Sequence, residues 1–158
     1  MNALIRKMTI DDIERVIAID RLSFSLPWPE RSFRFELTDN PASRCWVTEI
    51  DGEVVGIIVV WLILDEAHVA TIATHPDFRR QGVAKRLLSH ALRELSHEGA
   101  QSSFLEVRAS NVAAQEMYRK FGYEESGVRP RYYRDNDEDA FLMTLDSLDV
   151  ERLEDQEA

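Results

Sequence analysis

The chain has 158 residues, of which 44% are hydrophobic, and its formal net charge is −10 at pH 7. Length and composition fit one domain with a core of its own, and the acidic balance argues against a nucleic-acid-binding surface. The longest apolar run, residues 54–64, is about half as long as a membrane-spanning helix, which needs roughly 20 residues. We therefore predict that the protein binds neither nucleic acid nor a membrane.

The first third of the chain reads as a strand followed by two helices. Residues 4–8 form the first predicted strand, and Thr9 follows as a helix N-cap with Asp12 three positions on, much like a capping box. The prolines of the segment SLPWPE end this helix in a loop, and residues 30–37 form a second, short helix.

A strand-rich stretch comes next. Residues 44–50 and 53–64 read as strands joined by Asp51-Gly52, a strong hairpin signal, and residues 68–74 continue the strand character until Pro76. Cys45 lies in the first of these strands and is the only cysteine, so no internal disulfide can form. Together with the lack of a charged-then-apolar leader, this favours a reducing cytoplasm.

The remaining sequence alternates helices with strands. Apolar residues at helical spacing predict one helix from Gly82 to near Gly99, and another that is capped by Ser110 or Asn111 and ends at Gly122. Strand-like runs lie between and after these helices, at residues 103–108, 128–133 and 140–145.

This order of elements predicts a mixed α/β (α+β) fold. We expect one domain over residues 1–145, with a mixed central sheet of about seven strands and helices on both faces. Residues 146–158 contain six acidic residues and one basic residue, and we expect them to form a flexible, solvated tail.

The segment RRQGVAK, residues 79–85, lies between a predicted strand and the start of a predicted helix. The first N–H groups of a helix have no partner within it and attract anions, phosphates above all. Gly82 lets the backbone approach such a ligand, and Arg79, Arg80 and Lys85 add positive charge. The alternative is an ordinary turn followed by a basic solvent face. The segment matches neither the P-loop nor the dinucleotide-binding glycine pattern.

Three motifs in the same order resemble the GNAT superfamily of N-acetyltransferases. They are the R-x-x-G-x-A pattern at residues 79–84, LEVRASNVAAQEMYRKFGY at 105–123, and RYYRDNDEDAFLMTL at 131–145. Within the superfamily the chain is most similar to RimI-type ribosomal-protein alanine N-acetyltransferases, followed by the archaeal N-terminal acetyltransferases.

The resemblance implies acetyl-CoA as the co-substrate and no metal. It places the pantetheine arm on the backbone of one strand and the pyrophosphate on the amides that open the following helix, with one asparagine as a further contact. The residues it implies are Ile72, Ala73, Thr74, Arg80, Gln81, Gly82, Val83, Ala84, Lys85 and Asn111. A plain helix N-cap is the alternative role of Asn111.

The same resemblance makes Glu106 the general base and Tyr118 the acid that protonates the departing thiolate. We expect a raised pKa for Glu106, because a carboxyl group in an apolar run that faces a cleft is desolvated. The alternatives are an outward-facing Glu106 paired with Arg108, and a Tyr118 that only packs on its helix face. Without a nucleophilic cysteine signal, transfer is expected to be direct.

The expected acceptor is the free α-amine of a protein N-terminus. Tyr132 and Tyr133 resemble a tyrosine pair that closes over a peptide, and Leu26 and Trp28 are expected to form the opposite wall, with His68 as a wall residue or a second base. An α-amine, with a pKa of about 8, is easier to deprotonate than lysine at about 10.4. The N-terminal alanine of a ribosomal protein is the expected target. The alternatives are a small amine, such as a polyamine or aminoglycoside, and a non-catalytic acyl-CoA sensor.

Overall fold

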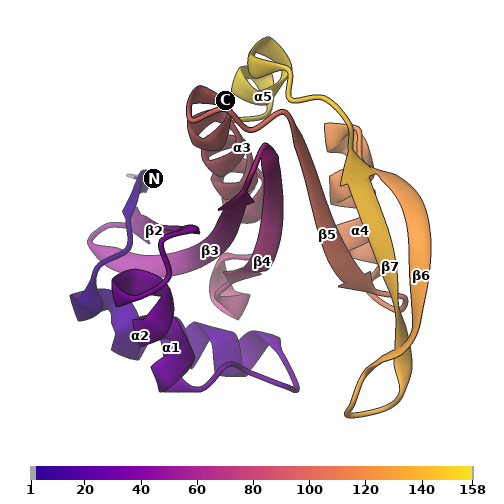
Figure 1. The fold of residues 1–158 in the computed structure, drawn as a ribbon. Coiled ribbons are helices and arrows are strands. Elements are labelled where there is room, and N and C mark those ends of the chain that lie inside the picture. Colours follow the sequence, from indigo (N-terminus) through magenta and orange to yellow (C-terminus); the bar gives the residue numbers. More distant parts are fainter. Residues whose placement is uncertain (1–2, 158) are drawn as a thin grey trace.

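The computed structural model of the chain describes residues 3–157, and side chains up to Glu154. Within this range seven strands form one sheet in the order β1-β2-β3-β4-β5-β7-β6. All neighbouring strands are antiparallel except β4 and β5, which are parallel. The predicted fold class is confirmed (Figure 1).

Every predicted strand and helix is present, although β6 begins four residues before the predicted segment 128–133 and helix α5 was not predicted. The strands are β1 (Ala3–Lys7), β2 (Ser43–Ile50), β3 (Glu53–Ile63), β4 (Glu66–Thr74), β5 (Ser102–Arg108), β6 (Glu124–Tyr133) and β7 (Glu138–Leu145). The helices are α1 (Ile13–Ser23), α2 (Glu30–Thr38), α3 (Val83–His97), α4 (Val112–Phe121) and α5 (Val150–Glu157). Short 3-10 turns at Ile10–Asp12 and Pro76–Phe78 precede α1 and α3.

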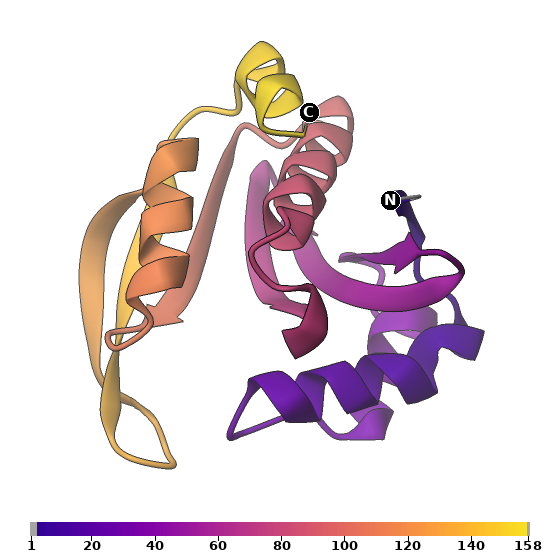
Figure 2. The ribbon, with the colours of Figure 1, turned by 180° about the vertical axis from the view of Figure 1, so that it is seen from behind.

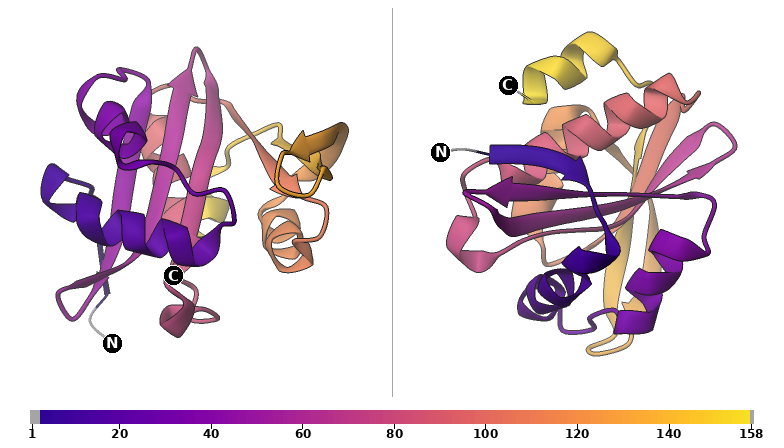
Figure 3. Two further views of the ribbon diagram at one scale, coloured as in Figure 1. Left: turned by 90° about the horizontal axis from the view of Figure 1, so that it is seen from below. Right: turned by 90° about the vertical axis from the view of Figure 1, so that its left-hand side faces the viewer.

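Helices cover both faces of the sheet. Helix α1 crosses one face with α2 beside it (Figure 3), whereas α3 covers the β1–β4 half and α4 the β5–β7 half of the other face (Figure 2). Strand β3 is buried on both sides, because Val54 and Ile57 pack with α1 and α2 while Val55 and Ile58 pack with α3. Burial on both faces explains why this segment is a continuous apolar run in the sequence.

Gly56 in β3 allows α3 to pack closely on the sheet. A Cβ atom at this position would lie 2.6 Å from Val83 Cγ1 and 3.0 Å from Leu87 Cδ1, closer than carbon atoms pack. The first turn of α3 therefore lies directly on the backbone of β3, and its position depends on the absence of a side chain there.

Strands β4 and β5 pair over only a short distance. Three pairs join them, from Glu66 with Ser102 to His68 with Phe104, and beyond these the two strands diverge (Figure 1). A bulge in β4 at Ala70, where the register with β3 changes between Val69 and Thr71, bends the strand at the start of the divergence. The sheet therefore opens between two of its central strands.

The structure differs from the expected flexible tail in containing helix α5. Asp149 begins the helix, because its carboxylate accepts hydrogen bonds from the backbone N–H groups of Glu151 and Arg152. Leu153 is only 2% exposed, and its carbonyl accepts a hydrogen bond from Ser89 of α3. Burial of this leucine attaches the acidic segment to the domain.

Candidate active site

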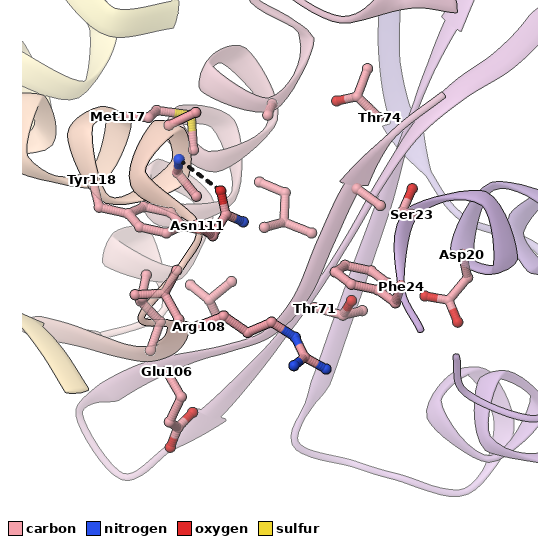
Figure 4. A pocket seen from close by; sticks show the side chains of 18 of the residues that line it. Asp20, Ser23, Phe24, Thr71, Thr74, Glu106, Arg108, Asn111, Met117 and Tyr118 are labelled. Atoms are coloured by element: carbon pink, nitrogen blue, oxygen red, sulfur yellow. Dashed lines mark hydrogen bonds between the residues drawn. The ribbon is translucent and has the colours of Figure 1, made fainter. Parts of the chain in front are cut away.

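The divergence of β4 and β5 forms a cleft of about 1080 Å³. Its walls come from β4, β5, the first turns of α3 and α4, the end of α1 with the loop that follows, and the β6–β7 hairpin. Figure 4 shows Tyr118 and Asn111 on one side of this cleft and Asp20, Phe24 and Thr71 on the other. Most of the predicted site residues, distant in sequence, meet in this one cleft.

The free edge of β4 forms one wall. Ile72, Ala73 and Thr74 line the cleft, and each is paired with β3 on its other side. Since β5 has diverged here, the backbone groups of β4 that point away from β3 are open to a ligand. An extended amide-containing chain can pair with such an edge as an added strand.

The start of α3 forms the second part of the site. Gly82 is the N-cap in a left-handed conformation, with φ 78°, and has no side chain to cap the amides that follow. Arg79 and Arg80 line the cleft beside them, as do Val83, Ala84 and Lys85. Gln81 is not among the lining residues, and its carbonyl accepts a hydrogen bond from Arg86. Unpaired amides, the helix dipole and nearby cations together suit a phosphate group.

The position of Asn111 is compatible with both of the roles that the sequence left open. Its side-chain oxygen accepts a hydrogen bond from the backbone N–H of Ala114 at 3.2 Å, which makes it the N-cap of α4. It also lines the cleft, and Figure 4 shows its side-chain nitrogen on the side away from that bond. This nitrogen remains free to donate to a ligand.

Glu106 lies on the face of β5 opposite to the core that α3 and α4 cover, because its neighbours Leu105 and Val107 belong to that core. Its Oε2 atom lies 2.9 Å from Nε2 of His68, and its Oε1 atom lies 3.6 Å from Nε of Arg129. His68 itself stacks on Phe104, with ring centroids 4.3 Å apart.

The predicted raised pKa of Glu106 is wrong. The hydrogen bond from His68 lowers the pKa of Glu106 below its ordinary value of 4.5, outweighing the opposing effect of burial, and Arg129 adds to the lowering. The suggested pairing with Arg108 is also absent, because Arg108 bonds instead to Asp135 and Glu138. Glu106 is therefore ionised at neutral pH.

Tyr118 lies on α4, on the other face of the sheet from Glu106. It is 5% exposed, packs against Tyr123, and still lines the cleft. Burial raises the pKa of its hydroxyl, so the group keeps its proton at neutral pH. Within the described part of the chain this hydroxyl has no hydrogen-bond partner. The cleft thus has a proton donor on one face and the carboxylate of Glu106 on the other. His68, predicted as a wall residue or second base, lies outside the lining and reaches the cleft only through its bond to Glu106.

Only some of the residues predicted to form the acceptor walls line the cleft. Leu26, Trp28 and Tyr133 line the cleft, whereas Tyr132 is 48% exposed and lies outside its lining. Tyr133 is covered by Arg108, whose guanidinium carbon is 4.0 Å from the ring centroid. One tyrosine of the pair therefore faces the cleft.

Two charged residues of the cleft were not predicted as site residues. Arg108 connects the hairpin to the α1–α2 loop, since it donates hydrogen bonds to Asp135 and to Ser25. Asp20 of α1 is 1% exposed and lines the cleft. A helical spacing that includes Ile13, Val16, Ile17 and Asp20 was the available signal, because it puts a carboxylate on the apolar face of the helix.

Two further observations concern the described residues as a whole. They contain no cluster of three or more histidine, cysteine or acidic side chains arranged to hold a metal ion. None of their helices combines the length and the apolar character needed to cross a membrane.

Comparisons with known proteins match this chain to a family model and to individual proteins. Residues 13–123 match the model of the acetyltransferase (GNAT) family. A Bacillus subtilis (strain 168) protein, described as a candidate [ribosomal protein bS18]-alanine N-acetyltransferase, is 39% identical over 141 residues, covering 89% of this chain and 93% of that protein. An N-alpha-acetyltransferase of the archaeon Sulfurisphaera tokodaii is 34% identical, covering 88% and 90%.

The fold is also similar to solved structures. The crystal structure of the ribosomal-protein-S18-alanine N-acetyltransferase from Escherichia coli matches with a TM-score of 0.85 and 31% identity. The match covers 94% of this chain and 96% of that one.

Proposed function

Because the chain belongs to the GNAT family of acetyltransferases, we propose that it transfers the acetyl group of acetyl-CoA to the free α-amine of a protein N-terminus. The acceptor is the N-terminal alanine of ribosomal protein bS18, as named for its relatives. The observation that supports this proposal is the cleft, which is lined by the start of α3 and by Tyr118 on one face of the sheet and by Glu106, bonded to His68, on the other.

The acetyl donor occupies the face covered by α3 and α4. Its pyrophosphate binds to the amides of residues 80–85, and its pantetheine arm pairs with Ile72, Ala73 and Thr74. The side-chain nitrogen of Asn111 donates to the same arm. The thioester then lies in the gap between β4 and β5, where an acceptor can reach it from the opposite face.

Direct transfer needs one base and one acid. The nitrogen of the acceptor attacks the thioester carbonyl carbon, and its proton passes to Glu106, directly or through His68, which is 2.9 Å away. As the carbon–sulfur bond breaks, Tyr118 gives its proton to the leaving thiolate. The raised pKa of Tyr118 keeps that proton available until the thiolate forms.

The ionised Glu106 matches an α-amine better than a lysine side chain. With its lowered pKa, Glu106 is a weak base, and it serves an amine that is already partly neutral at pH 7. An α-amine with a pKa of about 8 meets this condition, whereas a lysine with a pKa of about 10.4 does not. Leu26, Trp28 and Tyr133 form walls for the peptide that follows the amine.

The acidic residues of the hairpin contribute less to peptide attraction than their number indicates. Asp135 and Glu138 are already bonded to Arg108, and Asp139 accepts a hydrogen bond from the backbone of Arg131. The attraction for a basic ribosomal N-terminus therefore comes mainly from the net charge of −10. We place the reaction in the cytoplasm, where ribosomal proteins are made.

Acetyl-CoA-dependent thiol release against three substrates tests this proposal. They are a basic peptide with a free N-terminal alanine, the same peptide with a blocked N-terminus and an internal lysine, and a polyamine. Turnover of the first alone is the expected result. Turnover of the polyamine alone would identify a small-amine acetyltransferase, and acetyl-CoA binding without turnover of any substrate would point to a sensor.

A further inference from the structure

Asp20 is a buried carboxylate whose two oxygens have different surroundings. Its Oδ2 atom accepts a hydrogen bond from the backbone N–H of Trp28 at 2.7 Å. Its Oδ1 atom is buried and has no hydrogen-bond partner. The residue is 1% exposed and lies at the cleft wall, beside Phe24 and across from Tyr118 (Figure 4).

The other buried carboxylates among the described residues, Asp12 and Glu36, have hydrogen-bond partners. Asp12 forms a two-bond pair with Arg6, and Glu36 accepts hydrogen bonds from Asn40 and Trp61. Among the described side chains, Oδ1 of Asp20 is the only buried carboxylate oxygen without a hydrogen-bond partner. A structural role through the Trp28 bond needs only one oxygen, so it leaves the second one unexplained.

Either a cation or a hydrogen-bond donor would satisfy the Oδ1 atom of Asp20. No salt bridge reaches Asp20 within the described part of the chain, and Arg108, a cation of the same cleft, is bonded to Asp135 and Glu138. Burial raises the pKa of Asp20 to about 6, so the carboxyl group is still mostly ionised at neutral pH. A buried negative charge without a partner is costly, and a ligand that supplies a positive charge removes that cost.

An acceptor amine brings such a charge. An α-amine with a pKa of about 8 is mostly protonated at pH 7. We propose that Asp20 is an acceptor-binding residue, whose Oδ1 receives the α-ammonium group of the substrate before Glu106 and His68 remove its proton. This inference rests on the proposed N-terminal acetyltransferase function, and it assigns to Asp20 the recognition of the charged amine.

Two substitutions separate binding of the amine from the hydrogen bond that Asp20 accepts from the Trp28 backbone. Asp20→Asn removes the charge but keeps a side-chain oxygen for the Trp28 N–H, whereas Asp20→Ala removes both. Glu36→Gln is the matched control, because it removes a carboxylate charge from α2 at a position outside the cleft lining. Calorimetry then measures how tightly two peptides bind to the complex of the protein with coenzyme A. One peptide has a free N-terminal alanine, and the other is its N-acetylated form, which has no charge at the N-terminus.

The expected result is selective. Asp20→Asn weakens binding of the free peptide by roughly 10- to 100-fold, as loss of a hydrogen bond to a charged group does, and leaves the acetylated peptide unchanged. Asp20→Ala weakens both peptides, and Glu36→Gln weakens neither. An equal effect of Asp20→Asn on both peptides, or no effect on either, would overturn the inference alone. If the unmodified protein binds neither peptide, the proposed function fails and the inference fails with it.

Discussion

Substitution of Gly56 by alanine tests whether close packing of α3 on β3 positions the donor site. The new Cβ atom would lie 2.6 Å from Val83 Cγ1, whereas carbon atoms in contact are about 3.5–4.0 Å apart. The first turn of α3 must therefore move by about 1 Å. Such overpacking costs about 1–3 kcal/mol of folding free energy. About 0.4–1 kcal/mol is recovered because alanine lowers the conformational entropy of the unfolded chain.

The movement displaces the amides that bind the pyrophosphate. We expect the Kd for acetyl-CoA to rise about ten-fold, which corresponds to about 1.4 kcal/mol. Gly127→Ala is the matched control, because its Cβ atom would meet only Leu142, at 3.8 Å. Urea unfolding and calorimetric titration with acetyl-CoA are measured on both variants.

The comparison between the two glycine variants isolates the clash. Gly56→Ala is expected to be about 1–3 kcal/mol less stable than Gly127→Ala and to bind acetyl-CoA more weakly. Equal stability of the two variants would refute the close contact. Lower stability with an unchanged Kd would refute the link between the first turn of α3 and the donor site.

Three further predictions concern Tyr118, His68 and Leu153. Tyr118→Phe is expected to slow thiol release by about 10²–10⁴-fold, as loss of a general acid does. It should not lower the thermal unfolding midpoint, because no described residue forms a hydrogen bond with this hydroxyl, which lines the cleft. A slow but destabilised variant would instead indicate a packing role. His68→Ala removes the bond that lowers the pKa of Glu106, so the acid limb of the pH–rate profile should move to higher pH, and an unmoved limb would contradict this. Leu153→Ala should lower the free energy of unfolding in urea by about 2–5 kcal/mol, since this side chain is only 2% exposed. It should leave the Kd for acetyl-CoA unchanged. A stability loss below that range would show that α5 is not firmly attached.

The bond between His68 and Glu106 also makes stability depend on pH. The folded-state pKa of Glu106 is lower than its ordinary value of 4.5, so the folded state favours the ionised form. The contribution of this bond is complete above that value and is lost as the pH falls through the lower folded-state pKa. In His68→Ala, the acid-induced loss of stability over this range should be smaller.

The secondary structure was predictable because its signals are local. The hairpin at Asp51-Gly52 and the end of α4 at Gly122 both depend on residues with positive φ, at 50°, 83° and 106°. The start of α3 at Gly82 belongs to the same class, with φ 78°. Turn residues of this kind are visible in the sequence without knowledge of the fold.

The electrostatics of the site were not predictable in the same way. The pKa of Glu106 depends on His68, which lies 38 positions away in the sequence and approaches it only through the parallel pairing of β4 with β5. Arg108 likewise reaches Ser25 across the cleft. The sign of a pKa shift follows from such contacts, whereas burial alone, inferred from an apolar run, predicted the opposite sign.

Helix α5 and Asp20 show a second limit. In residues 146–158 the high charge obscured Leu153, whose burial attaches the segment to α3. In α1 the apolar residues at helical spacing obscured a carboxylate on the same face. In both cases a single residue departs from the average character of its segment, so a pattern averaged over the segment does not reveal it.

The most direct test of the central claim is to locate the acetyl group on the product. Purified bS18 with a free N-terminal alanine is incubated with the protein and acetyl-CoA, and tandem mass spectrometry identifies the modified nitrogen. We predict a single acetyl group, on the α-nitrogen of the alanine, with no modification of lysine side chains. Acetyl groups on lysine side chains with an unmodified N-terminus would contradict the assignment of this chain as an N-terminal acetyltransferase.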